Sequence, residues 1–262
     1  METDLQIDTH RAAAAPAKHD GPFGSSARAR SQRRAASPAL THLQPQVSSD
    51  PIARVTKEAI HWKRKLFHVV GIGTAAVAYA LTPVDPLVAC AIFAVFAAIF
   101  VGLDALRFYV PALNRKVKKD FGPLMRDYEL NGFSGSSWFL LAAVLCAGLF
   151  SKPAACLGFL CLAIGDPLAS WAGLRWGRIR LPGGKSLEGS LTLFAVSAVA
   201  SVALLTAVFG LGLAAATAVA VPTALVAAVA EGVPISKRFD DNFVMPIAAA
   251  AAAAAVLPLA IA

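Results

Sequence analysis

The chain has 262 residues, of which 57% are hydrophobic and 15% are charged, and its formal net charge is +8 at pH 7. This composition excludes an ordinary water-soluble domain, which needs far fewer apolar residues, and it predicts a polytopic membrane protein. Basic residues without interleaved aromatic residues more often mark the cytoplasmic face of a membrane protein than a nucleic-acid surface. We therefore expect no nucleic-acid partner.

The first 50 residues are rich in Ala, Ser, Pro and Arg and contain no apolar run. Such a segment cannot bury enough apolar surface to offset the entropy lost on ordering, so residues 1–50 are expected to form a disordered basic tail. The absence of an apolar run before residue 66 argues against a secretory signal. Residues 51–262 are expected to form one integral-membrane domain, whose first helix begins at the Asp50-Pro51 pair.

Seven apolar stretches follow the tail, and most of them approach the ~17–25 residues that a membrane-spanning helix needs. We therefore predict an all-α bundle of about seven transmembrane helices. The expected spans are residues 66–81, 86–103, 136–150, 153–164, 190–210, 212–230 and 243–261.

The distribution of Lys and Arg predicts the orientation of this bundle. Of the 24 Lys and Arg residues, all except Lys152 lie in residues 1–65, 104–135, 175–188 and 231–242. Because Lys and Arg are enriched in cytoplasmic loops, these four segments and the N-terminus are predicted to be cytoplasmic. The C-terminus is then predicted to lie on the opposite side.

The longest loop, residues 104–135, mixes basic residues with Phe108, Val117 and Phe121. This mixture fits an interfacial helix that contacts anionic lipid headgroups, and it also fits a solvated loop. The sequence leaves both alternatives open.

The four cysteines all lie inside apolar runs, and none belongs to a C-x-x-C pair or has a neighbouring set of metal ligands. We expect reduced packing residues rather than a zinc site or a disulfide framework. They are Cys90, Cys146, Cys156 and Cys161.

Two short motifs match parts of nucleotide-binding fingerprints but lack the required context. Residues 71–76 read G-x-G-x-x-A, yet they lie inside an apolar segment with no preceding strand, so close helix packing is the expected role. Residues 184–186 match only the end of a P-loop, because the position five residues before Gly184 is Ile179 instead of glycine. A Rossmann or Walker A site is therefore not expected.

Asp166-Pro167 follows an apolar segment and has the form of a helix start. Asp is a favourable N-cap, and Pro is tolerated at the first helical position, so one helix is predicted to end near Gly165 and another to begin at Pro167. A broken helix at membrane depth exposes backbone groups, which is tolerated where they line a wet or ligand-binding site.

Polar residues gather at the predicted cytoplasmic ends of the helices. Each one alone has an ordinary explanation as a helix cap or as a charge that reaches the interface. Together, several carboxylates facing a cluster of cations suit Mg²⁺ and a polyphosphate, because Mg²⁺ prefers oxygen ligands and usually takes substrate phosphates among them. A helix beginning at Gly189 would also direct its positive end towards a phosphate. The group comprises Arg64, Lys65, His68, Arg126, Glu129, Asp166, Lys185, Ser186, Glu188, Glu231, Asp240 and Asp241.

At these residues the chain resembles the dolichol kinase, phytol kinase and CTP-dependent diacylglycerol kinase family of integral-membrane lipid kinases. The resemblance covers roughly residues 58–247. It rests on Arg64-Lys65-Leu66-Phe67-His68 with Gly71, on Arg126-x-x-Glu129 before Ser134-Gly135, on Gly165-Asp166 with Ala169, Gly173 and Gly177, on Lys185-Ser186-x-Glu188-Gly189-Ser190, and on Glu231 with Asp240-Asp241-Asn242 and Pro246. It implies phosphoryl transfer from CTP to the hydroxyl of a long lipid alcohol, with residues 185–190 near the nucleotide.

Two other functions are considered. The carboxylate at Asp166, the G-x-x-x-G spacing and the K-S-x-E-G stretch are also similar to phosphatidate cytidylyltransferases, which transfer the cytidylyl group of CTP to a lipid phosphate. The elements at 64–68 and 240–242 are similar to the kinases instead. A small non-enzymatic transporter is the third possibility, although charges at helix ends and apolar span centres disfavour a permeation path.

For the kinase we expect Asp166, together with Asp240, Asp241 or Glu231, to hold Mg²⁺ on the CTP phosphates. Phosphoryl transfer depends mostly on positioning and charge stabilisation, so cations must neutralise the charge that develops on the transferred group. The expected cations are Lys185 and Arg64 or Lys65, and the expected nucleotide-binding residues are Lys185, Ser186, Glu188, Gly189, Ser190, Arg126 and Glu129. A carboxylate or His68 accepts the proton of the alcohol, and the sequence does not decide which.

Overall fold

The computed structural model describes residues 51–182, 184–232 and 239–261, and the backbone alone is described for residues 51–62, 64 and 261. All the described residues belong to one structural unit. The expected disorder of residues 1–50 and the side chain of Arg64 therefore lie outside what is described.

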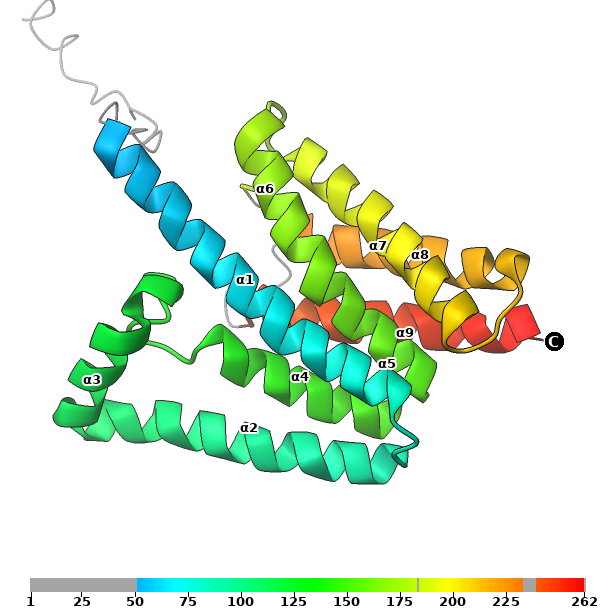
Figure 1. Cartoon of the computed structure of the whole chain (residues 1–262), viewed down its shortest axis with the longest axis horizontal. Coiled ribbons are helices and arrows are strands. Elements are labelled where there is room, and N and C mark those ends of the chain that lie inside the picture. The colour runs from blue at the N-terminus through cyan, green and yellow to red at the C-terminus, as the bar shows by residue number, and fades with distance from the viewer. Residues whose placement is uncertain (1–50, 183, 233–238, 262) are drawn as a thin grey trace, which may run out of the picture. The chain divides into compact units, whose positions relative to one another are not determined.

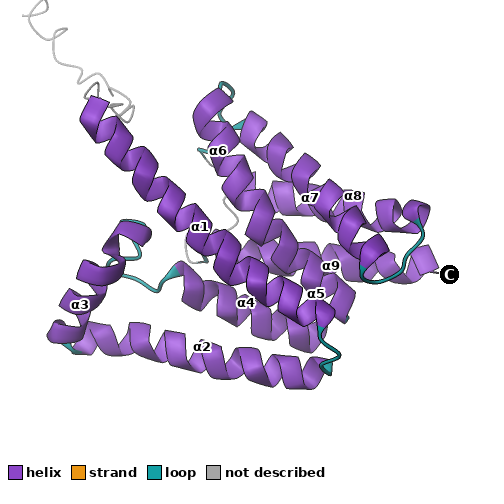
Figure 2. Cartoon of the chain, viewed as in Figure 1, coloured by secondary structure: helices purple, strands orange, loops and turns teal. Residues whose placement is uncertain are grey.

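The described residues form helices and turns and contain no strand, which confirms the all-α prediction (Figures 1 and 2). A 3₁₀ turn, Gly122–Leu124, follows α3, and a π-helical turn, Cys161–Gly165, joins α5 to α6. The α-helices are α1 (Pro51–Leu81), α2 (Pro86–Tyr109), α3 (Pro111–Phe121), α4 (Gly135–Leu149), α5 (Lys152–Leu160), α6 (Asp166–Trp176), α7 (Leu187–Ala207), α8 (Leu213–Gly232) and α9 (Asp241–Ile261).

Five helical segments of the described chain are long and apolar enough to cross a membrane. They confirm the prediction of a multi-pass helical membrane protein, without the number of spans. Two further apolar helices, Lys65–Leu81 and Gly135–Leu149, are shorter. At ~1.5 Å per residue, the 15 residues of α4 extend about 22 Å, which is less than the ~30 Å of a hydrocarbon core. The count of seven spans therefore stays a prediction. The five long segments are Pro86–Tyr109, Lys152–Trp176, Leu187–Ala207, Leu213–Gly232 and Asp241–Ala260.

The segment made of α5, the π turn and α6 forms the centre of the unit. It is mostly buried, whereas the other four long segments keep most of their apolar surface exposed, as lipid-facing helices do. Helix α5 packs against α1 and α9, α6 packs against α7, and α9 also contacts α4 and α8. The four cysteines are free thiols, and three of them are buried in this core, which agrees with their expected packing role.

The predicted helix break at Asp166 is wrong. Asp166 has φ −60° and ψ −47°, so it lies inside a continuous helical path and is not an N-cap. A π turn pairs carbonyl groups with amides five residues further along the chain, which accommodates the missing N–H of Pro167 without ending the helix. The span expected at 153–164 consequently extends to Trp176.

Residues 104–135, for which the sequence left an interfacial helix and a solvated loop open, are largely helical. Helix α2 continues to Tyr109, and α3 forms without any fully buried residue. Basic residues line α3 beside half-exposed apolar ones, so it is an amphipathic helix on the surface of the described unit. Contact between α3 and lipid headgroups stays a prediction.

Candidate active site

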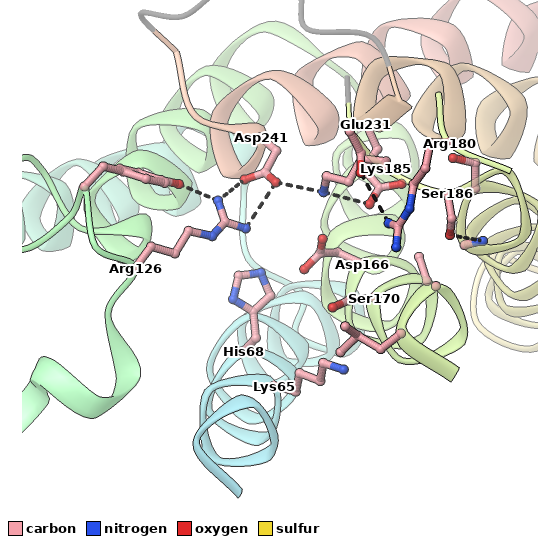
Figure 3. A pocket seen from close by; sticks show the side chains of 17 residues that line it. Lys65, His68, Arg126, Asp166, Ser170, Arg180, Lys185, Ser186, Glu231 and Asp241 are labelled. Atoms are coloured by element: carbon pink, nitrogen blue, oxygen red, sulfur yellow. Dashed lines mark hydrogen bonds and ion pairs between the residues drawn. The ribbon is translucent and has the colours of Figure 1, made fainter. Parts of the chain in front are cut away.

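A polar cavity of about 380 Å³ lies between the middle of α1, α6, the start of α7, the end of α8 and the start of α9 (Figure 3). The residues that line it come from positions more than 170 residues apart in the chain, and they include most of the predicted site. Figure 3 shows His68 and Asp166 pointing towards the space bordered by Asp241 and Lys185. The charged lining comprises Lys65, Arg126, Asp166, Arg180, Lys185, Glu231 and Asp241.

An ion-pair network joins the two cations that the cavity places nearest to its carboxylates. The Lys185 Nζ donates to Glu231 Oε1 at 2.9 Å and to Asp241 Oδ2 at 3.3 Å. The guanidinium of Arg126 donates to the two carboxylate oxygens of Asp241 at 2.7 and 3.1 Å. Asp241 therefore holds both cations at the edge of the same cavity.

The network keeps both cations charged at neutral pH. Burial alone would lower the pKa of Lys185, but the charges of Asp166, Asp241 and Glu231 outweigh burial and raise this pKa. Burial would likewise lower the pKa of Arg126, but the charge and hydrogen bonds of Asp241 outweigh burial and raise this pKa. Both side chains are thus permanent cations suited to phosphate.

Asp240 supports the network from behind the cavity. Its side chain is nearly inaccessible, accepts a hydrogen bond from the Tyr128 hydroxyl and lies 3.4 Å from Arg126. Burial and the adjacent charge of Asp241 raise the pKa of Asp240 to about 6. Asp241 lines the cavity, whereas Asp240 does not. Asp240 instead forms an ion pair with Arg126.

Asp166 approaches Lys185 because small residues let α6 and α7 pack closely. A Cβ added to Gly173 would lie 2.6 Å from Ser186 Oγ, and one added to Gly189 would lie 2.8 Å from the carbonyl oxygen of Ala169. The Asp166 side chain is largely buried, and its charge interacts with Lys185. Within the described part of the chain, its carboxylate accepts no hydrogen bond, so it stays available to a ligand.

A tight turn presents Lys185 to the cavity. Gly184 adopts φ +80°, a conformation that favours glycine, and the Leu181 N–H donates to the Lys185 carbonyl at 2.8 Å. Ser186 then caps α7 by accepting the Gly189 N–H at 3.1 Å. Helix α7 therefore begins at Leu187 and not at Gly189 as expected, and its positive end borders the cavity beside Ser186 and Ser190.

Two predicted nucleotide-binding carboxylates do not line this cavity. Glu188 accepts the Arg178 N–H at 3.0 Å and so stabilises the loop before Lys185. Glu129 is buried and accepts the Arg126 N–H at 2.7 Å and the Gly135 N–H at 3.0 Å. Both side chains bind backbone amides, which positions the cations of the site.

Lys65 and His68 lie three residues apart on α1, and both side chains line the cavity. Tyr128, Ser170 and Arg180 also line it and were not predicted. Arg180 belongs to the basic loop before Lys185, so its position in the sequence was a usable signal.

A buried ion pair between Asp104 and Arg107 was missed. Arg107 is 1% exposed, donates to Asp104 Oδ1 at 2.9 Å and to the Glu129 carbonyl at 2.7 Å, and also bonds the Gly132 carbonyl. Asp104 in turn accepts the Ser134 N–H at 2.8 Å. The pair joins the end of α2 to the loop that carries Arg126. An Asp and an Arg three residues apart in the last turns of an apolar helix would have indicated it.

Replacing Arg107 by Ala is expected to lower the free energy of unfolding by about 3–5 kcal/mol, because it leaves Asp104 as a buried charge without its cation. Denaturant titration of the purified chain in detergent measures this loss. Arg115, which is exposed on α3, provides the matched control, and Arg115→Ala should change stability by no more than about 0.5 kcal/mol. Equal stability of the two variants would contradict the structural role of Arg107.

Comparison with known proteins identifies relatives. The chain is 34% identical over 99 residues to the CTP-dependent diacylglycerol kinase 1 of Eremothecium gossypii, covering 37% of this chain and 31% of that protein. It is 33% identical over 93 residues to the protein of the same name from Schizosaccharomyces pombe, covering 35% of this chain and 43% of the relative. The chain is thus similar to CTP-dependent diacylglycerol kinases over about a third of its length. The predicted resemblance to that family is therefore confirmed.

The similarity to these kinases is partial, since the chain spans 31% and 43% of the lengths of the two fungal proteins. An uncharacterized protein of Rickettsia prowazekii is 33% identical over 135 residues, covering 50% of this chain and 64% of the relative. No family model matches the chain. No solved structure matches it either.

The carboxylates of the cavity fit a divalent cation that arrives with a nucleotide. The described residues contain no group of three or more His, Cys, Asp or Glu side chains placed to hold a metal ion by themselves. However, Glu231 Oε2 is buried and has no hydrogen-bond partner among the described residues, and Asp166 lies within electrostatic range of Glu231. Mg²⁺ is commonly bound through one or two carboxylates and substrate phosphates, so Asp166 and Glu231 suit it.

Proposed function

We propose that the protein transfers the γ-phosphoryl group of CTP to the hydroxyl of a membrane lipid alcohol. The single observation that carries this proposal is the cavity in which Asp166, Lys185, Glu231 and Asp241 meet beside the first turn of α7. The start of α7, the end of α8 and the start of α9 border the cavity, and we place the headgroup of the lipid there. Similarity to proteins named CTP-dependent diacylglycerol kinase 1 supports CTP as the donor.

The charges of the cavity suit a triphosphate bound with a divalent cation. Its lining has four permanent cations and three carboxylates, so its net positive charge is small. This charge alone does not balance a nucleotide triphosphate, and a divalent cation would supply the rest. We propose that Asp166 and Glu231 hold Mg²⁺, which when bound neutralises charge on the phosphate oxygens. Asp241 positions Lys185 and Arg126 through hydrogen bonds, and Asp240 positions Arg126 through an ion pair.

The chemistry then follows from position and charge. The acceptor oxygen attacks the γ-phosphorus, the bond to the β–γ bridging oxygen breaks, CDP leaves, and the alcohol proton passes to a base in the cavity. Lys185 and Arg126 stabilise negative charge on the transferred group, and the first amides of α7 add positive potential. His68 and Asp166 both point into the cavity, and either is positioned to accept the proton (Figure 3).

Diacylglycerol is the acceptor best supported, because the fungal relatives carry it in their names. A polyprenol and phytol are the other acceptors implied by the family resemblance. The full-length chain should be reconstituted in phosphatidylcholine vesicles with each alcohol in turn, with CTP or ATP as donor. Phosphorylated lipid formed with CTP and not with ATP is expected. Solute uptake by the same vesicles without lipid phosphorylation would support the transporter instead.

We also propose that the N-terminus and the cavity face the cytoplasm and that the C-terminus lies on the opposite side. Arg178 and Ser151 are exposed at opposite ends of the α5–α6 segment, which makes them suitable reporter positions. An impermeant maleimide added to intact cells is expected to label Ser151→Cys and to leave Arg178→Cys unlabelled until the cells are opened. The opposite labelling pattern would invert the orientation.

A further inference from the structure

A second cavity, of about 660 Å³, lies between α1, α2 and α4. Apolar side chains dominate its lining, among them Ile72, Phe93 and Phe139. It follows α1 from Phe67 to Thr82, which corresponds to about 22 Å of helix at ~1.5 Å per residue. We refer to it as the α1–α2 groove.

The α1–α2 groove meets the polar cavity at His68, which lines both of them. Figure 1 shows α1 and α2 joined by a short turn and diverging from it, and that turn is at the end of the groove remote from His68. Ile92 and Phe96 on α2 line the groove and remain nearly half exposed. The groove is thus open along its side to the surrounding lipid and has its polar end at the site.

From this continuity we infer that the α1–α2 groove binds one hydrocarbon chain of the lipid acceptor and places its hydroxyl beside His68. This inference rests on the proposed function and adds the location of the acceptor. A chain entering between α1 and α2 brings its polar end to the mouth of the polar cavity, where Asp166 and Lys185 lie.

Hydrophobicity alone does not hold a lipid there, because the bilayer is as apolar as the groove. The groove instead fixes the position of the hydrocarbon chain along α1. That position determines where the hydroxyl of the lipid lies relative to His68. An obstruction in the middle of the groove should consequently impair long-chain acceptors and spare short-chain ones, which need only the end near His68.

Ala75→Phe places a ring in the middle of the groove, and Ala78→Phe does so one turn further along α1. Ala94→Phe is the matched control, because Ala94 is exposed on α2 and does not line the groove. The full-length variants are reconstituted with a diacylglycerol that carries a photoreactive diazirine in one acyl chain, in the absence of CTP. Crosslinks to peptides of α1, α2 and α4 are expected in the parent and in Ala94→Phe, and at least tenfold fewer in both groove variants.

Phosphorylation is measured on the same preparations with long-chain and short-chain diacylglycerols. We expect kcat/KM for the long-chain acceptor to fall at least tenfold in the groove variants while the short-chain value stays near that of the parent. Parent-like crosslinking and long-chain activity in both groove variants would overturn the inference. Groove crosslinks in a parent that phosphorylates no lipid would overturn the proposed function and leave the binding site standing.

Discussion

Replacing Asp166 by Asn is expected to lower CTP-dependent lipid phosphorylation by on the order of 10²-fold or more, while the protein still folds and inserts. Asn has nearly the same shape as Asp, and the Asp166 backbone is helical, so the substitution removes no cap. What it removes is the negative charge that interacts with Lys185 in the cavity where we propose that the nucleotide phosphates bind. Initial rates at matched membrane abundance, over a titration of Mg²⁺ and CTP, measure the effect.

Asp85 provides a matched control for this substitution. Asp85 caps α2 by accepting the Leu87 N–H at 2.8 Å, at the end of α2 remote from Asp104 and Arg107. Asn caps a helix about as well as Asp, so Asp85→Asn should keep full activity. Near-parental turnover of Asp166→Asn across the whole Mg²⁺ range would show that Asp166 is not a metal ligand.

Replacing Lys185 by Gln is expected to reduce turnover by roughly 10²–10³-fold, since a positioned cation is lost from the transition state. The same change leaves the buried Glu231 carboxylate without its partner at 2.9 Å, so part of any loss would come from reduced stability. In the double variant Lys185→Gln/Glu231→Gln, a pair of neutral amides restores the hydrogen bond without a buried charge. Because Glu231 is itself a proposed Mg²⁺ ligand, the single variant Glu231→Gln is the reference for its activity.

A purely structural role for Lys185 predicts that the double variant has the activity of Glu231→Gln alone, whereas a role in phosphate binding predicts that it stays well below that activity although it is folded. Lys152→Gln is the control, because Lys152 bonds the Thr82 carbonyl at the end of α1 remote from His68. Steady-state kinetics and thermal unfolding of all four variants provide the comparison. Equal turnover of the double variant and Glu231→Gln would remove Lys185 from the proposed chemistry.

The sequence predicted those features that depend on local pattern. Apolar stretches predicted the helices, and Lys65 and His68, which were expected in the polar group, both line the cavity. Asp166-Pro167 was misread because the same dipeptide is compatible with a helix start and with a π turn. The close packing of Gly165, Gly173 and Gly189 between α6, α7 and the π turn keeps the chain helical there, and that contact is tertiary.

Tertiary contacts also explain what the sequence could not assign. Glu129 has the residue type of a ligand, but its carboxylate is saturated by the backbone amides of Arg126 and Gly135. Asp240 and Asp241 are neighbours in sequence, yet only Asp241 lines the cavity. No local rule separates these cases, because each depends on which direction the side chain takes after the helices pack.

The central claim is the transfer of a phosphoryl group, and the fate of two radioactive labels tests it most directly. Vesicles that contain both diacylglycerol and phosphatidate are incubated with the full-length chain and CTP labelled at either the α- or the γ-phosphorus. A kinase places the γ label in the lipid and leaves the α label in soluble CDP, which is the predicted result. Incorporation of the α label into lipid would contradict the claim and support cytidylyl transfer.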